Sequence, residues 1–404
     1  MTDSASARAD LLTEETLQDP HTLYAQLREE TPVQKVILPQ GLKAWLVTRY
    51  EDVRAALTDP RLHSDKRDID GVLSGHLDDQ GARDSFVDDL SRNLLNTDAP
   101  DHTRLRGLVN KAFTPRRVAA LRPRVEQITD ELLDRLPTGV ETDLLAGFAL
   151  PLPIIVICEL LGVPPKDRGA FTEWSNALLS AEDGAATAEA GQAMVGFLSG
   201  LLAEKRAHPT DDLLSALVQA RDDEDRLDES ELISMALLLL VAGNESTVNL
   251  IGNSVLALLR HPEQLAAVRA DPGLLPGAIE EFLRYDGPIN QATFRCTSEP
   301  VRIGDTEIPA NELVVVALTS ANRDPRQFPD ADRLDIRRSP QGHLAFGHGP
   351  HFCLGAPLAR LEGQIALGRL LERFPGLRLA RAPEELTYRF STIIRGLTEL
   401  PVVL

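Results

Sequence analysis

Hydrophobic residues recur at helical spacing along most of the chain, so the sequence predicts a mainly α-helical protein. Residues 121–136 form one such segment, with Pro123 near its start and Pro137 directly after it. Residues 150–161 form an apolar segment closed by Gly162 and Pro164. A further amphipathic helix is expected from about residue 357 to residue 374.

Strand-like patterns are few and short. Residues 44–48 and 313–318 predict two strands, and residues 301–309 predict a hairpin that turns at Gly304 and Asp305. Residues 388–403 favour an irregular C-terminal hairpin. Two Gly- and charge-rich stretches, 64–81 and 181–191, are typical of surface loops or short mobile helices. The predicted fold class is therefore mainly α with a small β portion.

The longest apolar pattern begins after Asp228 and continues to about Arg260, before Pro262. Glu231 stands three residues after Asp228, which is a capping-box arrangement. Some 32 residues at 1.5 Å each give a helix of about 48 Å. Since it is apolar on nearly every side, it belongs in a protein interior.

Polar residues interrupt this helix at its centre, where residues 242–247 read Ala-Gly-Asn-Glu-Ser-Thr. Burying Glu245 is costly unless the carboxyl group is paired, hydrated or protonated. One interpretation is that Glu245 faces a surface groove. The other is a widened helix in which Glu245 and Ser246 deliver protons to a central ligand.

A second polar motif pairs Glu281 with Arg284, three residues apart on one helix face. Taken alone, it predicts a surface salt bridge worth less than about 1 kcal/mol.

The most informative stretch, 346–356, reads Phe-Gly-His-Gly-Pro-His-Phe-Cys-Leu-Gly-Ala. Gly347, Gly349 and Gly355 permit positive φ and close backbone approach. Cys353 precedes a predicted helix, whose first N–H groups favour a thiolate over a thiol. One alternative is a buried structural cysteine. Another is a zinc site made from His343, His348, His351 and Cys353, although the usual Cys-x-x-Cys or His-x-x-x-His spacing is missing.

Charge narrows the classes of partner. The 404 residues include 42 Lys and Arg and 61 Asp and Glu, a net charge of −19 that argues against nucleic-acid or anionic-membrane binding.

The chain has three cysteines, a low number that is typical of proteins in a reducing compartment. The N-terminal residues lack a signal-peptide pattern, and the most apolar run, 236–243, is too short for a bilayer, so we expect a cytoplasmic protein. Without a repeat, linker or composition break, we predict a flexible tail at 1–11 and a single domain at 12–404.

In this order, the motifs resemble those of the cytochrome P450 family, specifically the soluble bacterial haem-thiolate monooxygenases. The resemblance covers nearly the whole chain and is strongest with actinomycete enzymes that hydroxylate macrolides, other polyketides and steroid-like molecules. The cysteine loop matches the haem-thiolate signature, residues 242–247 the oxygen-activating helix, and Glu281 with Arg284 the buried acid–arginine pair. By the same resemblance, Arg333 completes a Glu–Arg–Arg cluster that braces the loop.

The resemblance implies haem b, iron protoporphyrin IX, with Cys353 as the axial thiolate. It places Phe346, Gly347 and Gly355 against the cofactor. The two propionates need local cations in an acidic protein, and the candidates are His102, Arg106, Arg295 and His351. The alternative for these four is a scatter of surface cations.

The resemblance also implies that Glu245 and Ser246 relay protons to bound O₂. Many relatives have threonine where Ser246 stands; serine keeps the hydroxyl but lacks the methyl that fixes its rotamer, which leaves the tightness of coupling open. Other chemistries on the same scaffold are an O₂-independent rearrangement or a peroxide-driven reaction. A haem-based sensor or carrier is a non-enzymatic alternative.

The expected substrate is a bulky lipophilic secondary metabolite such as a macrolide or other polyketide, with steroid-like or fatty-acid substrates as the alternative. The resemblance points to a pocket made by Leu94, Leu95, Ala242, Ile289, Ala292 and Ile393, each of which could instead be a plain core position.

No flavin or iron–sulfur motif is visible, so electrons must come from a partner. A basic run without an intervening acid suggests docking of an acidic ferredoxin, itself reduced by an NAD(P)H-dependent reductase; the alternative is a solvated basic helix face. The docking candidates are Arg104, Lys111, Arg116 and Arg117. A monomer is the family expectation.

Overall fold

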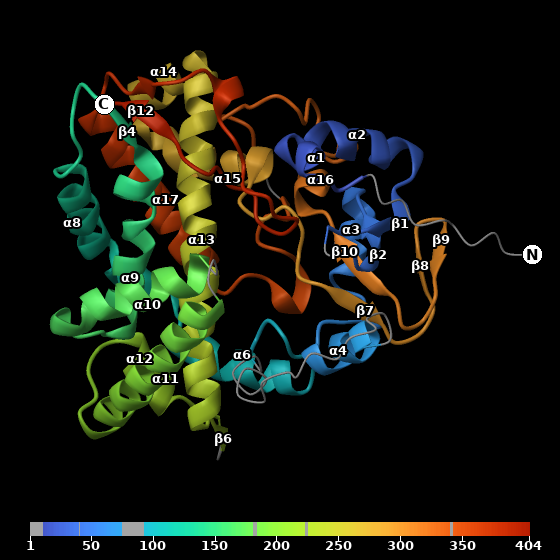
Figure 1. Cartoon of the computed structure of the whole chain (residues 1–404), viewed down its shortest axis with the longest axis horizontal. Helices are drawn as coiled ribbons and strands as arrows, with labels where there is room; N and C mark the ends of the chain where they lie inside the picture. Colours follow the sequence, from blue (N-terminus) through green and yellow to red (C-terminus); the bar gives the residue numbers. More distant parts are fainter. Residues whose placement is uncertain (1–10, 40, 75–92, 181–183, 223–224, 340–341) are drawn as a thin grey trace, which may run out of the picture. The chain divides into compact units, whose positions relative to one another are not determined.

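The computed structural model describes residues 11–39, 41–74, 93–180, 184–222, 225–339 and 342–404. The chain divides into two compact units, whose elements are labelled in Figure 1. The first unit contains residues 1–82, 249–353 and 377–403, and the second contains residues 83–248, 354–376 and 404. Each is described by itself below, and the single domain at 12–404 stays a prediction. Residues 1–10 of the predicted tail lie outside the described residues, and its last residue, Leu11, is buried in the first unit.

A five-stranded sheet organises the first unit, in the order β1-β2-β10-β7-β3. Its strands are β1 (Val33–Ile37), β2 (Lys43–Val47), β3 (Leu62–His63), β7 (Arg295–Thr297) and β10 (Leu313–Val316). The pair of β2 and β10 is parallel, and the other pairs are antiparallel. The predicted strands at 44–48 and 313–318 are confirmed with small shifts at their ends, whereas the other three were not predicted.

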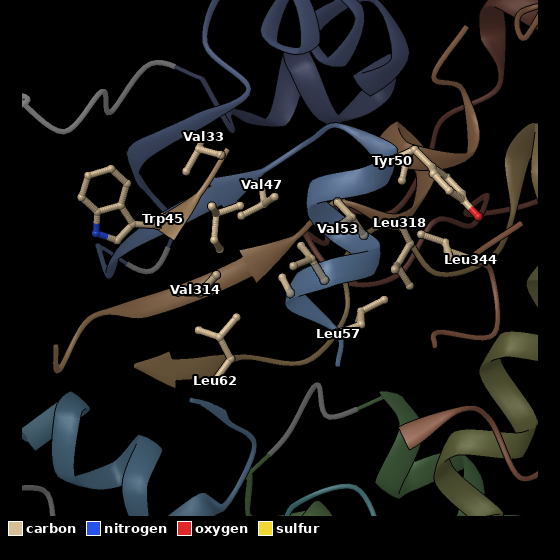
Figure 2. Packing of buried hydrophobic residues seen from close by; sticks show 14 of the residues in the cluster. Val33, Trp45, Val47, Tyr50, Val53, Leu57, Leu62, Val314, Leu318 and Leu344 are labelled. Atoms are coloured by element: carbon tan, nitrogen blue, oxygen red, sulfur yellow. The ribbon is translucent and has the colours of Figure 1, made fainter. Parts of the chain in front are cut away.

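Strand alternation separates two hydrophobic cores, one on each face of this sheet. Trp45 and Val47 belong to one cluster with Val314, and this cluster includes Val53 of α3 (Tyr50–Ala56), as Figure 2 shows. The intervening residues, such as Leu46 and Val315, belong to the other cluster, which includes Leu17, Tyr24 and Leu27 from the N-terminal helices. The sheet is therefore covered on both faces.

The remaining elements of the first unit are short. Its helices include α1 (Glu14–Gln18), α2 (Pro20–Glu30), α4 (Lys66–Ser74), α14 (Pro262–Ala270), η3 (Pro272–Leu274), α15 (Leu275–Asp286), α16 (Leu318–Asn322), η4 (Gly349–His351) and η5 (Pro383–Glu385). The predicted hairpin is confirmed as β8 (Val301–Ile303) and β9 (Thr306–Ile308). Near the C-terminus, β11 (Arg378–Leu379) pairs with β12 (Pro401–Val403), and Tyr388 bridges to Leu397, so an irregular hairpin is present.

The second unit is mostly helical. Its helices include α6 (Asp101–Ala112), α7 (Pro115–Ala120), α8 (Arg122–Leu133), η1 (Leu145–Ala149), α9 (Pro151–Leu161), η2 (Pro165–Asp167), α10 (Arg168–Ser180), α11 (Gly184–Ala207), α12 (Leu213–Gln219) and α17 (Ala356–Arg373). Its described strands are β4 (Glu141–Asp143), β5 (Arg221–Asp222) and β6 (Asp225–Arg226). The helices predicted at 121–136, 150–161 and 357–374 correspond to α8, α9 and α17.

The end of α9 shows why its boundary was predictable. Gly162 takes a left-handed φ of 68°, a conformation that glycine adopts without a Cβ penalty. Its neighbour Val163 donates its backbone N–H to the carbonyl oxygen of Cys158 at 2.9 Å.

The two stretches predicted as surface loops or short helices, 64–81 and 181–191, are helical where they are described. Residues 66–74 form the short helix α4. Helix α11 begins at residue 184 and is long. Residues 75–81 and 181–183 lie outside the described residues.

The long helix is α13 (Glu229–Arg260), and its predicted N-terminal capping box is present. The backbone N–H of Glu231 donates to Asp228 at 2.8 Å, and the backbone N–H of Asp228 donates to Glu231 at 2.9 Å. By length and composition alone α13 could cross a membrane, but 61% of its most apolar window is buried, which is typical of a core helix. The predicted widening at 242–247 is absent, because α-helical geometry continues throughout.

Candidate active site

Residues 346–353 of the cysteine loop belong to the first unit, and two glycines shape them. Gly347 and Gly349 adopt φ of 71° and 73°. A Cβ at Gly349 would lie 2.6 Å from a methyl carbon of Thr58, so no other residue fits without displacement. Gly355 differs from the sequence expectation: its φ is −77°, and it precedes α17 as the N-cap.

This loop presents Cys353 on its surface. The backbone N–H of Cys353 donates to the carbonyl oxygen of Phe346 at 2.9 Å, which closes the loop. The rings of Phe346 and Phe352 lie edge to face with centroids 6.3 Å apart. Cys353 is exposed, unlike the buried Cys158 and Cys296, so the alternative of a buried structural cysteine is wrong.

Glu281 and Arg284 form a completely buried ion pair on α15. The Nε of Arg284 donates to Oε2 of Glu281 at 2.7 Å, and Nη2 donates to Oε1 at 2.8 Å. The pair is therefore bidentate, which is the strongest geometry for an arginine and a carboxylate. The surface salt bridge that this motif predicts on its own is excluded.

The third member of the cluster is Arg338, so the prediction of Arg333 is wrong. The Nε of Arg338 donates to Oε1 of Glu281 at 3.2 Å. The Arg333 guanidinium is 68% exposed and pairs with Asp335 at 2.7 Å. Only the backbone of Arg333 takes part, because its carbonyl oxygen accepts from Arg284 at 3.3 Å and from Arg338 at 3.2 Å.

A chain of hydrogen bonds connects the Glu281–Arg284 pair to the segment that precedes the cysteine loop. Arg284 donates to the carbonyl oxygens of Asn322 and Ala331, at 3.0 and 2.8 Å. The side-chain oxygen of Asn322 accepts the backbone N–H of Leu344 at 2.6 Å, two residues before the loop. The cluster thus fixes the chain where it enters the loop.

The zinc alternative finds no support in this region. His343 lies 3.0 Å from Glu280 and is engaged there. Within the described parts of the chain, no group of three or more His, Cys, Asp or Glu side chains could hold a metal ion.

The centre of α13 carries the acid and the hydroxyl. Ser246 donates its hydroxyl hydrogen to the carbonyl oxygen of Ala242 at 2.7 Å, and Thr247 donates to Gly243 at 2.9 Å. Such back-bonding locally perturbs a helix without breaking it. Glu245 is half-buried, and Asn244 is 2% exposed with neither amide atom hydrogen-bonded in the described structure. Asn244 was not among the predicted site residues, although it lies inside the same motif.

Comparisons with known proteins identify the family to which these features belong. A sequence model of cytochrome P450 matches residues 273–385. The chain is 58% identical to cytochrome P450 107B1 of Saccharopolyspora erythraea over 385 residues, 95% of each protein. It is 47% identical to the vitamin D(3) 25-hydroxylase of Pseudonocardia autotrophica, over 100% of this chain and 98% of the relative.

The chain belongs to the cytochrome P450 family. Its structure is similar to that of the cytochrome P450 PksS of the Bacillus subtilis bacillaene polyketide synthase, with a TM-score of 0.89, 40% identity, and coverage of 97% of this chain and 98% of that one. The predicted fold and the prediction of a P450 monooxygenase are confirmed.

P450 enzymes hold a haem iron through a cysteine thiolate, and the residues present fit that group. The loop offers one exposed thiol. Beside it, Phe352 is 39% exposed. A large apolar side chain left exposed next to the thiol is suited to contact with a flat apolar cofactor.

The four propionate candidates fall in different units of the P450. His102 is buried and Arg106 half-buried, both on α6 in the second unit. Arg295 is buried on β7 in the first unit, where Nη1 donates to the carbonyl oxygen of Leu62 at 3.2 Å, and His351 is half-buried in η4. Their convergence on one cofactor stays a prediction.

Three of the six pocket candidates meet in the first unit. Ile289 and Ala292 are partly buried against the cluster of Figure 2. The carbonyl oxygen of Ile393 accepts the backbone N–H of Asn290 at 2.7 Å, which places the two segments side by side. The other candidates belong to the second unit: Leu94 is buried, Leu95 half-buried and Ala242 exposed.

The docking candidates, all in the second unit, differ in their exposure and in their engagement with acids. Arg104 pairs with Glu231 of α13. Arg117 donates to the carbonyl oxygen of Asp212 at 2.8 Å and lies 3.4 Å from the Asp211 carboxylate. Lys111 and Arg116 are exposed.

Proposed function

We propose that this P450 monooxygenase inserts one oxygen atom of O₂ into a C–H bond, or epoxidises an alkene, of a bulky lipophilic secondary metabolite such as a macrolide or other polyketide. The observation that carries the proposal is the exposed Cys353 on its glycine-shaped loop. The substrate class is supported by the similarity to a polyketide-synthase P450 and by the half-buried apolar side chains of Ile289, Ala292 and Ile393.

The overall reaction balances as substrate, O₂, two electrons and two protons giving oxidised product and one water. Haem b, once bound through Cys353, supplies the thiolate push that favours O–O cleavage. Around it, Phe346, Gly347 and Gly355 would contact the ring. His102, Arg106, Arg295 and His351 would neutralise its propionates.

Glu245 and Ser246 supply the protons in this proposal. The single hydroxyl hydrogen of Ser246 is directed to the Ala242 carbonyl, so its Oγ lone pairs are available to accept a proton from a donor. Ser246 Oγ would accept a proton from Glu245, half-buried at the preceding position, and release its own hydroxyl hydrogen into the pocket, after which Glu245 takes up a proton from solvent. Rotation about χ1 moves Oγ between these two positions, and serine rotates more freely than threonine.

The Ser246→Ala variant tests this relay. It should raise the hydrogen peroxide released per NAD(P)H consumed while leaving haem binding intact. Thr247→Ala, one residue further along the same helix, is the matched control. Equal peroxide release from wild type and Ser246→Ala would assign the relay to water or substrate instead.

We also propose that the electrons arrive from an acidic ferredoxin reduced by an NAD(P)H-dependent reductase. Lys111 and Arg116 are the two candidates in the exposed class, so we assign the docking charge mainly to them. Arg116→Glu should slow ferredoxin-driven turnover, more at low salt than at high salt. Peroxide-driven turnover is the control, and an equal loss in both would contradict docking at this site.

A cytoplasmic, monomeric enzyme is part of the same proposal, consistent with the acidic composition and the largely buried α13. Binding to nucleic acid or membrane is not part of it.

Substrate binding and turnover test the function together. The purified holoenzyme is titrated with a panel of macrolactones and with vitamin D3, and the Soret shift that reports displacement of iron-bound water is recorded. Ligands that bind are then incubated with ferredoxin, reductase, NADPH and ¹⁸O₂. Incorporation of one labelled oxygen atom into product supports the proposal, and full activity without reductant and O₂ would contradict it.

A steroid-like substrate is the second candidate, favoured by the identity with a vitamin D(3) 25-hydroxylase over the whole chain. The same panel discriminates between the two, because only one class should give both the Soret shift and labelled product.

A further inference from the structure

A buried polar cluster in the first unit joins the N-terminal helices to the C-terminal segment. At its centre, Oδ1 of Asp286 accepts from Nε of Arg395 at 3.1 Å and from Nε2 of His21 at 3.0 Å. The Tyr388 hydroxyl donates to Oδ2 at 3.3 Å. Burial alone would raise the pKa of Asp286, but Arg395, His21 and Arg323 hold it below its ordinary value, so the group is an anion.

The junction between α1 and α2 is hydrogen-bonded to the C-terminal segment at Arg395 and at Tyr388. Nη1 of Arg395 donates to the carbonyl oxygens of Leu17 and Gln18, at 3.2 and 3.1 Å. The amide side chain of Gln18 clasps the backbone of Tyr388, donating to its oxygen at 3.0 Å and accepting from its nitrogen at 2.8 Å. The Arg395 guanidinium also stacks over the Tyr388 ring at 3.4 Å.

Residues 387–398, which contain both of these contacts, form a hairpin that we call the C-terminal hairpin. Its arms are joined by the backbone bonds from Thr398 to Thr387 and from Arg389 to Gly396, both 2.9 Å. Ile393 lies within it, and Arg395 donates its backbone N–H to Pro288 at 2.8 Å.

The turn of the C-terminal hairpin is exposed, whereas its second arm is buried and hydrogen-bonded to residues 288–291 and to Asn253. Phe390, its largest side chain at the turn, is 52% exposed, and Arg389 is exposed as well. A two-stranded hairpin is marginally stable by itself, so outside contacts must set where it lies. Arg395, at 5% exposure, is the side chain that ties the hairpin both to Asp286, through Nε, and to the α1–α2 junction, through Nη1.

We propose that the α1–α2 junction, acting through Arg395 and Asp286, positions Ile393 beside Ile289 and Ala292 and thereby determines which substrates this P450 accepts. The inference rests on the proposed function in one respect, namely that Ile393 lines the substrate pocket. Gln18, Asp286 and Arg395 are positioning residues, because they act through the hairpin and not on the substrate.

Two iron-binding probes of different size test the proposal on the holoenzyme. Imidazole binds without reaching far from the iron, whereas 4-phenylimidazole extends into the pocket. Arg395→Met should change the ratio of their spectral Kd values by about fivefold or more, and Gln18→Ala by about twofold. Arg395→Lys keeps the charge but loses the forked contact, so its ratio should lie between those of wild type and Arg395→Met.

Gln26→Ala is the matched control, since Gln26 lies on α2 and its side chain donates to the exposed Glu30, away from the C-terminal hairpin. Its Kd ratio should equal that of wild type. If Arg395→Met fails to fold, Gln18→Ala and Tyr388→Phe, which remove single contacts, carry the test. Unchanged ratios in both would overturn the proposal.

Different results would refute the proposed function and the role of the α1–α2 junction. A wild-type enzyme without thiolate-ligated haem would refute the proposed function itself. A wild-type enzyme that binds both probes normally, with variants that match it, would refute only the role of the α1–α2 junction.

Discussion

Two buried glutamates, one in each unit, are held in opposite ways. Glu281 on α15 accepts hydrogen bonds from Arg284, Arg338 and the backbone N–H of Asp335. Glu362 on α17 is 2% exposed, and its Oε2 makes no hydrogen bond in the described structure. Burial raises the pKa of Glu362 to about 8, so it carries a proton at neutral pH.

The difference shows that burial alone does not decide whether a carboxyl group is protonated. The charged and polar groups that face it decide its protonation state. Removing one partner from a buried ion pair leaves an uncompensated charge, whereas removing the ionisable group of an unpaired acid removes a cost. Removing the charged partner of Glu281 should therefore destabilise the protein, whereas removing the ionisable group of Glu362 should relieve a cost that grows with pH.

Arg284→Met should give the largest effect. It leaves Glu281 buried without its bidentate partner, and we expect a loss of about 3–5 kcal/mol in the free energy of unfolding. Denaturant unfolding of the holoenzyme measures it. Arg302→Met removes a solvent-exposed pair with Glu307 and is the control. A loss below about 1 kcal/mol for Arg284→Met would show that the cluster contributes no more than a surface pair.

Glu362→Gln should give the next largest effect, visible as a change in pH dependence. The folded pKa of about 8 exceeds the ordinary value of 4.5, so the folded state retains its proton to higher pH than the unfolded state. The stability contributed by Glu362 is full below pH 4.5 and is lost as pH rises through 8, by roughly 3 kcal/mol between pH 5 and pH 8.

Unfolding curves across that pH range check this expectation. Glu362→Gln should flatten the decline, and Glu372→Gln on the exposed side of the same helix should leave it unchanged. An identical slope in wild type and Glu362→Gln would mean that Glu362 is paired and ionised.

Arg338→Met and Arg333→Met sharpen the comparison at the Glu281 cluster. Arg338 donates to the buried carboxylate, so its loss should cost about 1.5–3 kcal/mol. The exposed guanidinium of Arg333 pairs with Asp335, and its loss should stay within about 0.5 kcal/mol. The reverse ranking would restore Arg333 as the third member of the cluster.

The elements that the sequence predicts well are those with local signals. Asp228 and Glu231 mark the start of α13, Gly162 marks the end of α9, and Gly304 marks the turn between β8 and β9. Strands β3 and β7 were missed, because they are only two and three residues long and pair with each other far along the chain. Strand β1 was missed although it pairs with the adjacent β2.

The residue types of the site could be predicted from the sequence, but the contacts between residues that are far apart in the chain could not. Arg333, Arg337 and Arg338 lie within six residues, and only the path of the backbone decides which guanidinium reaches Glu281. Glu362 could have been found, since helical spacing places it on the same face as the buried Leu358 and Ile365. The Asp286 cluster could not, because Gln18 and Arg395 are separated by 377 residues.

The central claim is that Cys353 holds the haem iron as a thiolate, and the spectrum of the reduced protein under carbon monoxide tests it most directly. Wild type and Cys296→Ala should both show the Soret position of thiolate-ligated haem, and Cys353→His should lose it. A wild-type spectrum at the position of histidine-ligated haem, or a thiolate spectrum that survives in Cys353→His, would contradict the account.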